Sequence, residues 1–242
     1  MHSIASTIKH VPLTTHRAKK DTDMCYYLTS DEFGRSRANR LSIVKRLIDH
    51  AIALAALVLL LPLMALIAIA VKLSSRGPVF FVQSREGMGS EPIRVAKFRT
   101  MYIDADLRLA RYLQTNPAAE KYWRSFYKVS PDPRVVRFIG TFLRKTSLDE
   151  LPQLWSVIKG DMSLVGPRPW PYSDLQSFSR QYRYMRNSVW PGLSGLWQIR
   201  RGNNRAKEKY DKFYVRHWSL ALDIKILFST IPVVLFAKKA HY

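Results

Sequence analysis

The residues from Ala51 to Val71 form an unbroken apolar run, and this run constrains the fold more than any other feature of the sequence. Its 21 residues include no charged or strongly polar side chain. As a straight helix, the run would be about 31 Å long, close to the thickness of the hydrocarbon core of one bilayer. The simplest interpretation is therefore one ordinary transmembrane helix.

Two details of this segment favour a different geometry. Pro62 lies near its middle, where proline removes a helical hydrogen bond and clashes with the carbonyl group of Val58. Basic residues also flank the run on both sides: Arg35, Arg37, Arg40, Lys45, Arg46, Lys72, Arg76 and Arg85. The positive-inside rule then places both ends at the cytoplasm. We favour a re-entrant helix that breaks at Pro62 and returns to the same face, with a spanning helix as the alternative.

The overall composition limits the class of protein. Of the 242 residues, 47% are hydrophobic, which excludes a wholly disordered chain and allows a folded core. The net charge of +21 predicts an anionic partner: a nucleic acid, an anionic lipid or a phosphorylated substrate. The single cysteine, Cys25, excludes an intramolecular disulfide and leaves no cysteine-based zinc site. Residues 1–40 are polar, and we interpret them as an extension rather than a signal peptide, with a short docking segment as an alternative.

A β-hairpin is predicted after the apolar run. Val79–Ser84 has the pattern of a strand, a glycine-containing segment follows it, and Ile93–Thr100 has the alternation of a second strand. Lys97 and Arg99 fall on the same face of this second strand. The hairpin is therefore expected to offer two cations on one side.

The rest of the chain is predicted to be mostly helical. Apolar residues recur at helical spacing in the segments Asp104–Leu113, Arg137–Lys145 and Leu148–Lys159. The uncharged run Ile226–Ala237 is too short to span a bilayer, and we interpret it as an interfacial or docked helix. Residues 180–217 interleave basic and aromatic side chains, a pattern that is also found in proteins that bind polyanions.

Two adjacent carboxylates, Asp149 and Glu150, are candidate catalytic residues. Either Ser147 and Glu150 form a capping box, or Asp149 is the N-cap residue and Pro152 lies in the first turn of the helix. Most acidic pairs of this kind are solvated capping residues. Residues 121–147, however, carry 7 basic side chains and 1 acidic one, and carboxylates among cations suit a nucleophile and a metal ligand that act on a polyanion. The helix N-terminus and these cations are expected to keep Asp149 ionised.

A rigid loop follows the helix that begins near this acidic pair. Gly166, Pro167 and Pro169 enclose Arg168, and such a loop can hold a guanidinium group at a fixed angle for bidentate contact with a phosphate. The sequence has no GxxxxGK(S/T), GxGxxG, GxSxG or HExxH motif, so the common nucleotide-hydrolase, serine-hydrolase and metalloprotease signatures are missing. Phosphate chemistry in this chain would depend on arginine, lysine and a metal ion.

Eight short blocks occur in a fixed order along the chain. They are residues 45–49, 83–87, 97–101, 132–135, 143–154, 160–169, 191–198 and 211–223. Together they extend over about residues 42–240, and their order is more specific than any single block. In this order they resemble the bacterial sugar transferase family, the monotopic polyprenyl-phosphate phosphoglycosyl transferases.

The resemblance implies a two-step transfer of a phosphosugar. Asp149 would attack the β-phosphorus of a nucleotide-diphosphate sugar, release the nucleoside monophosphate and form an aspartyl-phosphosugar, which polyprenyl phosphate then accepts. Glu150 corresponds to a Mg²⁺ ligand of the family. The basic phosphate-handling positions of the family correspond to Lys97, Arg99, Arg144 and Arg168, and a late acidic position corresponds to Asp223. Such chemistry needs neutralisation of phosphate charge, and a covalent intermediate divides one difficult step into two.

The chain departs from the family pattern at two places. The family often has Ser-Pro at the break of its membrane helix, where this chain has Leu61 and Pro62, so the kink is kept without the serine hydroxyl. The family usually reads Gly-Arg-Asn after its Trp-Gln pair, whereas this chain has Arg and Gly exchanged, so Arg201 is a partial match for a phosphate-binding residue. Pro62 and Arg85, which lies in the second block, complete the candidate residues.

We therefore expect an α+β, predominantly helical protein with a re-entrant membrane helix, amphipathic interfacial helices and a small β-hairpin. Its expected parts are a polar extension (1–40), the membrane helix (41–73) and a catalytic domain (74–242) on the cytoplasmic face of a bacterial inner membrane. The resemblance implies a UDP-sugar donor, a polyprenyl phosphate acceptor such as undecaprenyl phosphate, UMP as product and Mg²⁺ as cofactor. The product would start an exopolysaccharide, capsule, O-antigen or glycoprotein glycan, with downstream glycosyltransferases as further partners.

Two other functions fit parts of the sequence. A membrane-anchored nucleic-acid-binding protein would explain the net charge of +21 and the basic, aromatic stretch 180–217, but it leaves the block around Asp149 and Glu150 unexplained. A non-catalytic scaffold of a glycan assembly complex would not need the intact Asp149, Glu150 and Lys97. Galactose, glucose and N-acetylated amino sugars are all compatible with the sequence, and the oligomeric state is left open.

Overall fold

The computed structural model describes residues 32–126, 129–172, 174, 178–200 and 204–235. The chain divides into two units, Met1–Leu41 and Ser42–Tyr242. Of the first unit the structure describes residues 32–41, which begin helix α1 (Glu32–Ser74), so most of the predicted polar extension lies outside the described residues. The other described helices and strands belong to the second unit.

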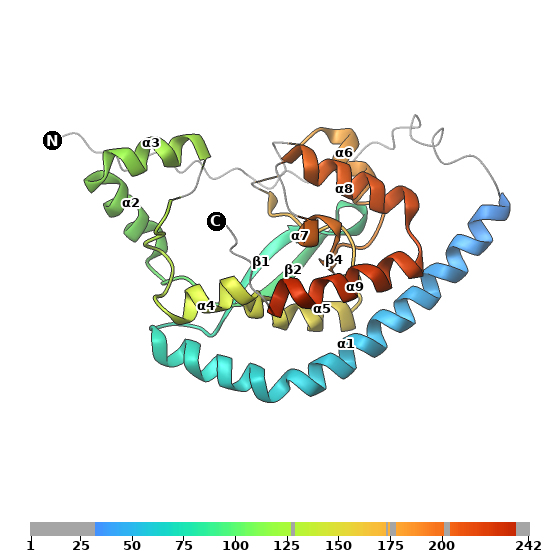
Figure 1. The fold of residues 1–242 in the computed structure, drawn as a ribbon, viewed down its shortest axis with the longest axis horizontal. Coiled ribbons are helices and arrows are strands. Elements are labelled where there is room, and N and C mark those ends of the chain that lie inside the picture. Colours follow the sequence, from blue (N-terminus) through green and yellow to red (C-terminus); the bar gives the residue numbers. More distant parts are fainter. Residues whose placement is uncertain (1–31, 127–128, 173, 175–177, 201–203, 236–242) are drawn as a thin grey trace. The chain divides into compact units, whose positions relative to one another are not determined.

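Helix α1 carries the apolar run and continues without interruption past Pro62. Figure 1 shows a bent helix, so the predicted break is a bend within one helix, as an internal proline favours. Within the described residues, Ser42–Ser74 is the one helical segment long and apolar enough to cross a membrane. Many of its large apolar side chains are more than half exposed, among them Leu54, Val58, Leu59, Leu61, Leu66 and Leu73. This exposure is typical of a helix that faces lipid rather than a protein core.

The predicted hairpin is confirmed as an antiparallel pair of strands, β1 (Phe80–Glu86) and β2 (Pro92–Phe98), with the short 3₁₀ helix η2 (Met88–Ser90) between them. Ile93 and Val95 are buried, because β2 turns this face toward the core. Lys97 is the next residue in the same alternation, so it lies on that face at the end of the strand.

A second pair of strands does not appear among the sequence-based expectations. The three-residue strands β3 (Ser163–Val165) and β4 (Gly192–Ser194) pair in parallel. The chain segments approach so closely here that a Cβ atom on Gly192 would lie 2.0 Å from the backbone nitrogen of Gly166, so no larger residue fits at Gly192. This contact fixes the start of the loop that contains Arg168.

Helices cover these strands, and the sequence-based predictions hold for most of them. The segments predicted around residues 104, 137 and 226 are confirmed with shifted bounds as α2 (Ala105–Thr115), α4 (Ile139–Thr146) and α9 (Leu220–Leu235). The segment predicted from Leu148 is divided into the 3₁₀ helix η3 (Leu148–Gln153) and α5 (Leu154–Ile158). The remaining helices are α3 (Pro117–Phe126), α6 (Arg180–Arg186), α7 (Leu196–Arg200) and α8 (Asn204–His217).

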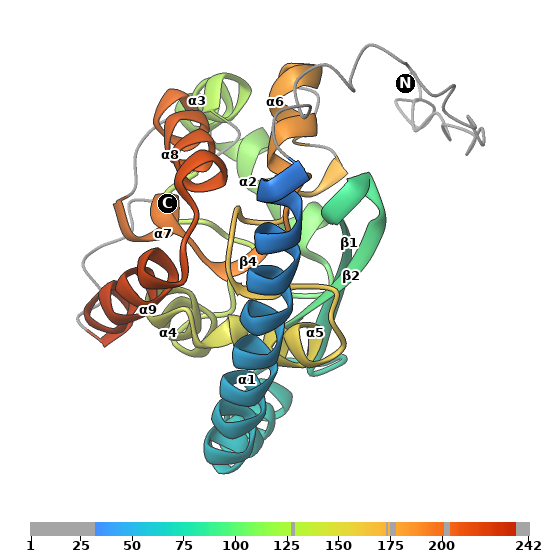
Figure 2. The same cartoon turned by 90° about the vertical axis from the view of Figure 1, so that its right-hand side faces the viewer.

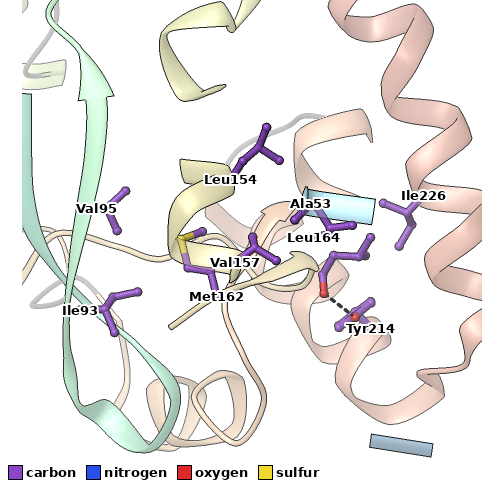
Figure 3. Close-up of a cluster of buried hydrophobic side chains, with 10 residues drawn as sticks. Ala53, Ile93, Val95, Leu154, Val157, Met162, Leu164, Tyr214 and Ile226 are labelled. Atoms are coloured by element: carbon purple, nitrogen blue, oxygen red, sulfur yellow. Dashed lines mark hydrogen bonds between the residues drawn. The ribbon is translucent and has the colours of Figure 1, made fainter. Parts of the chain in front are cut away.

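The main core joins residues that are far apart in the sequence. Figure 3 shows side chains from α1, β2, α5, β3, α8 and α9 converging on one another: Ala53, Ile93, Val95, Leu154, Val157, Met162, Leu164, Tyr214 and Ile226. A second cluster, formed by Ile67, Val71, Phe98 and Leu143, packs the C-terminal half of α1 against β2 and α4. The membrane helix is therefore part of the core rather than a separate anchor.

Helices α4, α5 and α9 expose large apolar side chains. Figures 1 and 2 both show these helices in the half of the second unit near the middle of α1, away from α6 and α8. The exposed side chains are Phe138, Phe142, Trp155, Ile224, Phe228 and Ile231. Amphipathic helices with such a face fit the predicted interfacial position.

Candidate active site

Three separate segments form a cluster of two carboxylates and two cations. Lys97 comes from the end of β2, Asp149 and Glu150 come from η3, and Arg168 comes from the loop after β3. The Lys97 Nζ atom lies 2.5 Å from Glu150 Oε1 and 3.9 Å from Asp149 Oδ2. The structure therefore assembles four of the residues predicted from the sequence into one cluster, which we call the dyad site.

Both carboxylate oxygens of Glu150 accept hydrogen bonds from cations. Arg168 binds both of its carboxylate oxygens, with Nη1 lying 3.0 Å from Oε2 and Nη2 also bonded to Oε1, where Lys97 adds its ammonium group. Burial alone would raise the pKa of Glu150, but the attraction of Arg168 and Lys97 and their hydrogen bonds lower it well below the usual range. Glu150 therefore stays ionised.

Asp149 differs from its neighbour, although it is also buried, with 8% of its surface exposed. Among the hydrogen bonds of the described residues, none reaches its carboxylate, and its ion pair with Lys97 is long. Burial raises the pKa of Asp149, the charge of Glu150 raises it further, and Lys97, Arg168 and Arg144 oppose this rise. The expectation that its surroundings keep Asp149 ionised at neutral pH stays a prediction, in which burial opposes the effect of the nearby cations.

The local backbone explains part of this difference. Ser147 is the N-cap residue of η3 and adopts a left-handed conformation with φ of 58°, and its side chain makes no capping hydrogen bond. Neither the capping box nor the Asp149 N-cap is therefore formed. Because η3 is a six-residue 3₁₀ helix, it offers little of the dipole stabilisation that a long α-helix gives an anion.

Two other predicted arginines occupy different positions. Arg144, in the last turn of α4, donates from Nε to Thr100 Oγ1 at 2.9 Å and adds to the positive potential at Asp149. Arg99 lies one residue beyond β2 and donates to carbonyl groups directly after the C-terminal end of α1, namely Ser75 O at 2.8 Å and Arg76 O. Lys97 and Arg99 therefore do not form the predicted pair of cations on one face.

The remaining candidate residues have other neighbours. Asp223 lies on α9 and binds Lys45, Tyr214 and Trp218, none of which is a dyad-site residue. Pro62 lies inside α1. Arg85 is buried at the end of β1, where burial, followed by the charge of Arg168, lowers its pKa to about 10, and it holds the carbonyl of Pro169. Arg201 lies outside the described residues.

Sequence reasoning missed Arg186. It belongs to the basic stretch 180–217, which suggests a solvated surface, yet only 2% of Arg186 is exposed, and it donates to the main-chain carbonyl of Arg168. Its side chain lies four residues after that of Tyr182, which is also buried, so both point inward from α6. The helical spacing of Tyr182 and Arg186 is the one sequence signal that could have indicated this.

The donor set of the site fits Mg²⁺ in its usual mode of binding. In the part of the chain that the structure describes, no three His, Cys, Asp or Glu side chains gather at one point. Mg²⁺ does not need such a cage, because it is commonly held by one or two carboxylates together with phosphates of the substrate. Glu150 would supply such a carboxylate, and Lys97 and Arg168, which bind it, lie beside the position of the ion.

Comparison with known proteins identifies the family. The model of the bacterial sugar transferase family matches residues 40–237. This chain belongs to that family. The chain is 41% identical over 202 residues to the exopolysaccharide production protein ExoY of Sinorhizobium fredii, a match that covers 82% of this chain and 88% of ExoY.

Longer relatives carry more specific names. The chain is 43% identical over 220 residues to the UDP-glucose:undecaprenyl-phosphate glucose-1-phosphate transferase of Escherichia coli, covering 84% of this chain and 43% of that protein. It is 37% identical over 241 residues to the UDP-galactose-lipid carrier transferase of Erwinia amylovora, covering 96% of this chain and 49% of that protein. The chain spans less than half the length of these two relatives. The predicted family and enzyme class, a phosphoglycosyl transferase, are thereby confirmed.

Proposed function

We propose that the protein transfers a sugar 1-phosphate from a UDP-sugar to undecaprenyl phosphate or a similar polyprenyl phosphate, and releases UMP. The observation that carries this proposal is the buried, weakly paired Asp149 beside a Glu150 that Lys97 and Arg168 hold. The relatives in E. coli and E. amylovora support the substrate classes by their names. The product would be the first lipid-linked intermediate of an exopolysaccharide or a similar surface glycan.

In the first step, an oxygen of the Asp149 carboxylate attacks the β-phosphorus of the donor. A bond forms between this oxygen and phosphorus, and the bond from the β-phosphorus to the bridging oxygen breaks, so that UMP leaves with the bonding electron pair. The guanidinium of Arg168 and the ammonium of Lys97 stabilise the charge that develops on the phosphate oxygens. Because Asp149 has few competing hydrogen bonds, its carboxylate is available as a nucleophile.

In the second step, the phosphate oxygen of the polyprenyl phosphate attacks the phosphorus of the aspartyl-phosphosugar. The bond from Asp149 to phosphorus breaks, the carboxylate is regenerated, and polyprenyl-diphosphate sugar is released. Both phosphate groups are anionic, so the cations around the dyad again lower the repulsion between nucleophile and electrophile. No net proton transfer is required in either step.

We also propose Mg²⁺ as the cofactor, held by Glu150 and the diphosphate of the donor. When bound, the ion would neutralise charge on the diphosphate and polarise its phosphorus–oxygen bonds. Lys97 and Arg168, which bind Glu150 in the present arrangement, would keep the carboxylate ionised and oriented.

The location that we propose is the cytoplasmic face of the bacterial inner membrane. The lipid-facing side chains of α1 and the exposed apolar side chains of α4, α5 and α9 support membrane association. Labelling of single cysteines placed at positions 40 and 76, in a background without Cys25, should find both on the cytoplasmic side. A periplasmic position 40 would contradict the re-entrant geometry and support a spanning α1.

The covalent route is tested by donor alone. Each member of a panel of UDP-sugars is incubated with the protein and Mg²⁺ without lipid, and intact-mass spectrometry and UMP release are measured. The wild-type protein should gain one phosphosugar with the preferred donor, and Asp149→Asn should gain none. Near-normal turnover by Asp149→Asn in the presence of polyprenyl phosphate would replace the covalent route with direct attack by the lipid.

A further inference from the structure

The loop that carries Arg168 is held at every carbonyl group from Pro167 to Trp170. The donors come from β4, α6 and β1: Gly192 N–H to Pro167 O at 2.9 Å, Arg186 Nη2 to Arg168 O, Arg85 Nη1 to Pro169 O at 2.8 Å, and Glu86 N–H to Trp170 O at 3.0 Å. Two of the four residues are prolines, which also restricts the backbone torsions of the loop. The backbone on both sides of Arg168 is therefore held by donors from three elements.

Two of these donors are buried guanidinium groups, which are unusual donors for a loop. Arg186 is 2% exposed and Arg85 is 8% exposed. Burial of a cation costs free energy unless charge and hydrogen bonds offset it, and main-chain carbonyls could have been satisfied by neutral donors. Several nitrogen atoms of the two groups are buried without a hydrogen bond, namely Arg85 Nε, Arg186 Nε and Arg186 Nη1. Simple stabilisation of the fold therefore explains these arginines poorly.

The surroundings of each guanidinium orient it toward the loop. The Arg186 Nε atom lies 3.6 Å from Asp211 Oδ2 of α8, and the same Asp211 oxygen accepts a hydrogen bond from the Tyr182 hydroxyl at 2.6 Å. Arg85 also donates to Gln83 Oε1 at 3.2 Å, two residues earlier in β1. The two arginines thus approach neighbouring carbonyls from two different elements, each with its own support.

We propose that Arg186 and Arg85 are positioning residues for the transfer reaction, which hold the backbone of Arg168 and Pro169 so that the Arg168 guanidinium stays directed at Glu150 and the donor diphosphate. This inference rests on the proposed function. Displacement of a catalytic group by about 1 Å can reduce a rate by roughly 100-fold, so the backbone position of Arg168 matters as much as its charge. Neither arginine needs to touch the substrate.

A double-mutant cycle on kcat/KM for UMP release tests the coupling. Arg186→Met should lower kcat/KM by roughly 10- to 100-fold in the wild-type background, and by less than about 3-fold when Arg168 is already replaced by Met, because the loop then has no guanidinium to position. Arg186→Lys, which keeps one donor for the Arg168 carbonyl, should recover part of the loss. Arg180→Met removes an exposed charge from the same helix, and should leave kcat/KM within about 2-fold.

Hydrogen exchange gives a readout that does not depend on activity. Because Pro167 and Pro169 have no N–H group, the amides of Arg168 and Trp170 report on this segment alone. Both should exchange faster in Arg186→Met than in the wild-type protein and Arg180→Met, under conditions where all three are folded. If Arg186→Met does not fold, Arg85→Lys provides the same two measurements from the other side of the loop.

The two readouts separate failure of this inference from failure of the proposed function. Equal losses of kcat/KM from Arg186→Met in the wild-type and Arg168→Met backgrounds would overturn the positioning role, as would unchanged exchange at Arg168 and Trp170. If the wild-type protein releases no UMP from any UDP-sugar, the proposed function fails, and the role in catalysis fails with it. The exchange experiment would still decide whether the arginines hold the loop.

Discussion

Two clusters of carboxylates and cations have similar compositions, but their carboxylates differ in how many hydrogen bonds they accept. One is the dyad site, with Asp149, Glu150, Lys97 and Arg168. The other joins α1 to α8 and α9, and we call it the α1 network: Lys45, Asp49, Ser163, Tyr214, Trp218 and Asp223. Each contains two carboxylates and at least one cation.

In the α1 network, both carboxylates accept short hydrogen bonds and lie close to Lys45. Asp223 accepts hydrogen bonds from Lys45 at 2.6 Å, from Tyr214 at 2.8 Å and from Trp218 at 2.9 Å. Asp49 accepts from the Ser163 hydroxyl at 2.6 Å and lies 3.4 Å from Lys45. Lys45 and Tyr214 also donate to Val165 O, so the network attaches the membrane helix to β3.

In the dyad site, the hydrogen bonds from Lys97 and Arg168 reach Glu150 and not Asp149. Glu150 receives both cations, whereas Asp149 has the 3.9 Å ion pair with Lys97. A saturated carboxylate is stable and unreactive, and a buried carboxylate with few partners has a raised pKa and available lone pairs. The α1 network therefore joins distant parts of the fold, whereas the dyad site leaves Asp149 with the few partners that the proposed nucleophile requires.

Asp149→Asn should have the largest effect, on turnover. In the proposed covalent mechanism this change removes the nucleophile, which should lower kcat by roughly 1,000-fold or more. The melting temperature should rise by roughly 2–4 °C for each kcal/mol gained. Burial raises the pKa of Asp149 in the folded protein, so its charge at neutral pH destabilises the fold, and a neutral amide removes this penalty. UMP release and thermal melting measure both effects. A lower melting temperature would mean that Asp149 is as well satisfied as Asp223.

Asp223→Asn should have the opposite profile. Removal of one charge from a buried ion pair typically costs about 3–5 kcal/mol, so the melting temperature should fall by roughly 10 °C. Turnover per folded molecule should change little, because Asp223 contacts no dyad-site residue. The matched control is Asp161→Asn, which breaks the surface pair with Lys159 and should change stability by less than about 1 kcal/mol. A loss of turnover without a loss of stability would mean that Asp223 takes part in catalysis rather than in stabilising the fold.

Lys97→Met should change the pH dependence of the reaction. In the proposed mechanism Asp149 must be deprotonated to attack, so kcat/KM should fall as the pH decreases through its pKa, which burial raises. Because Lys97 lowers this pKa, its removal should move the acidic limb of the profile to higher pH. The profile of kcat/KM for UMP release measures the shift. If the acidic limb of the kcat/KM profile does not shift, a group other than Asp149 determines the loss of activity at low pH.

Trp218→Phe should give the smallest effect. It removes one of three hydrogen bonds to Asp223 and keeps an aromatic side chain, so stability should fall by about 1 kcal/mol with turnover unchanged. Thermal melting and UMP release again distinguish the two roles. A loss as large as that of Asp223→Asn would mean that the three donors act as one cooperative unit rather than as separate bonds.

Local features of the sequence predicted the elements but not the contacts between them. The apolar run, the hairpin and the acidic pair depend on neighbouring residues, so composition, alternation and adjacency were sufficient to find them. The alternation failed for Arg99, because it holds only within a strand, and β2 ends at Phe98. Beyond that point, carbonyl groups at the end of α1 determine where the guanidinium lies.

The sequence by itself determined the family, the membrane helix and the identity of the dyad, because eight ordered blocks and a 21-residue apolar run need no knowledge of the fold. The tertiary structure decided how many hydrogen-bond donors reach each carboxylate. Asp149 and Asp223 are both aspartates in basic surroundings, and only packing shows that three donors reach Asp223 whereas Asp149 is buried with a distant lysine. The burial of Arg186 also depends on α6, α8 and the Arg168 loop meeting in space. Desolvation and hydrogen bonding are sums over neighbours from distant parts of the chain, which no local pattern records.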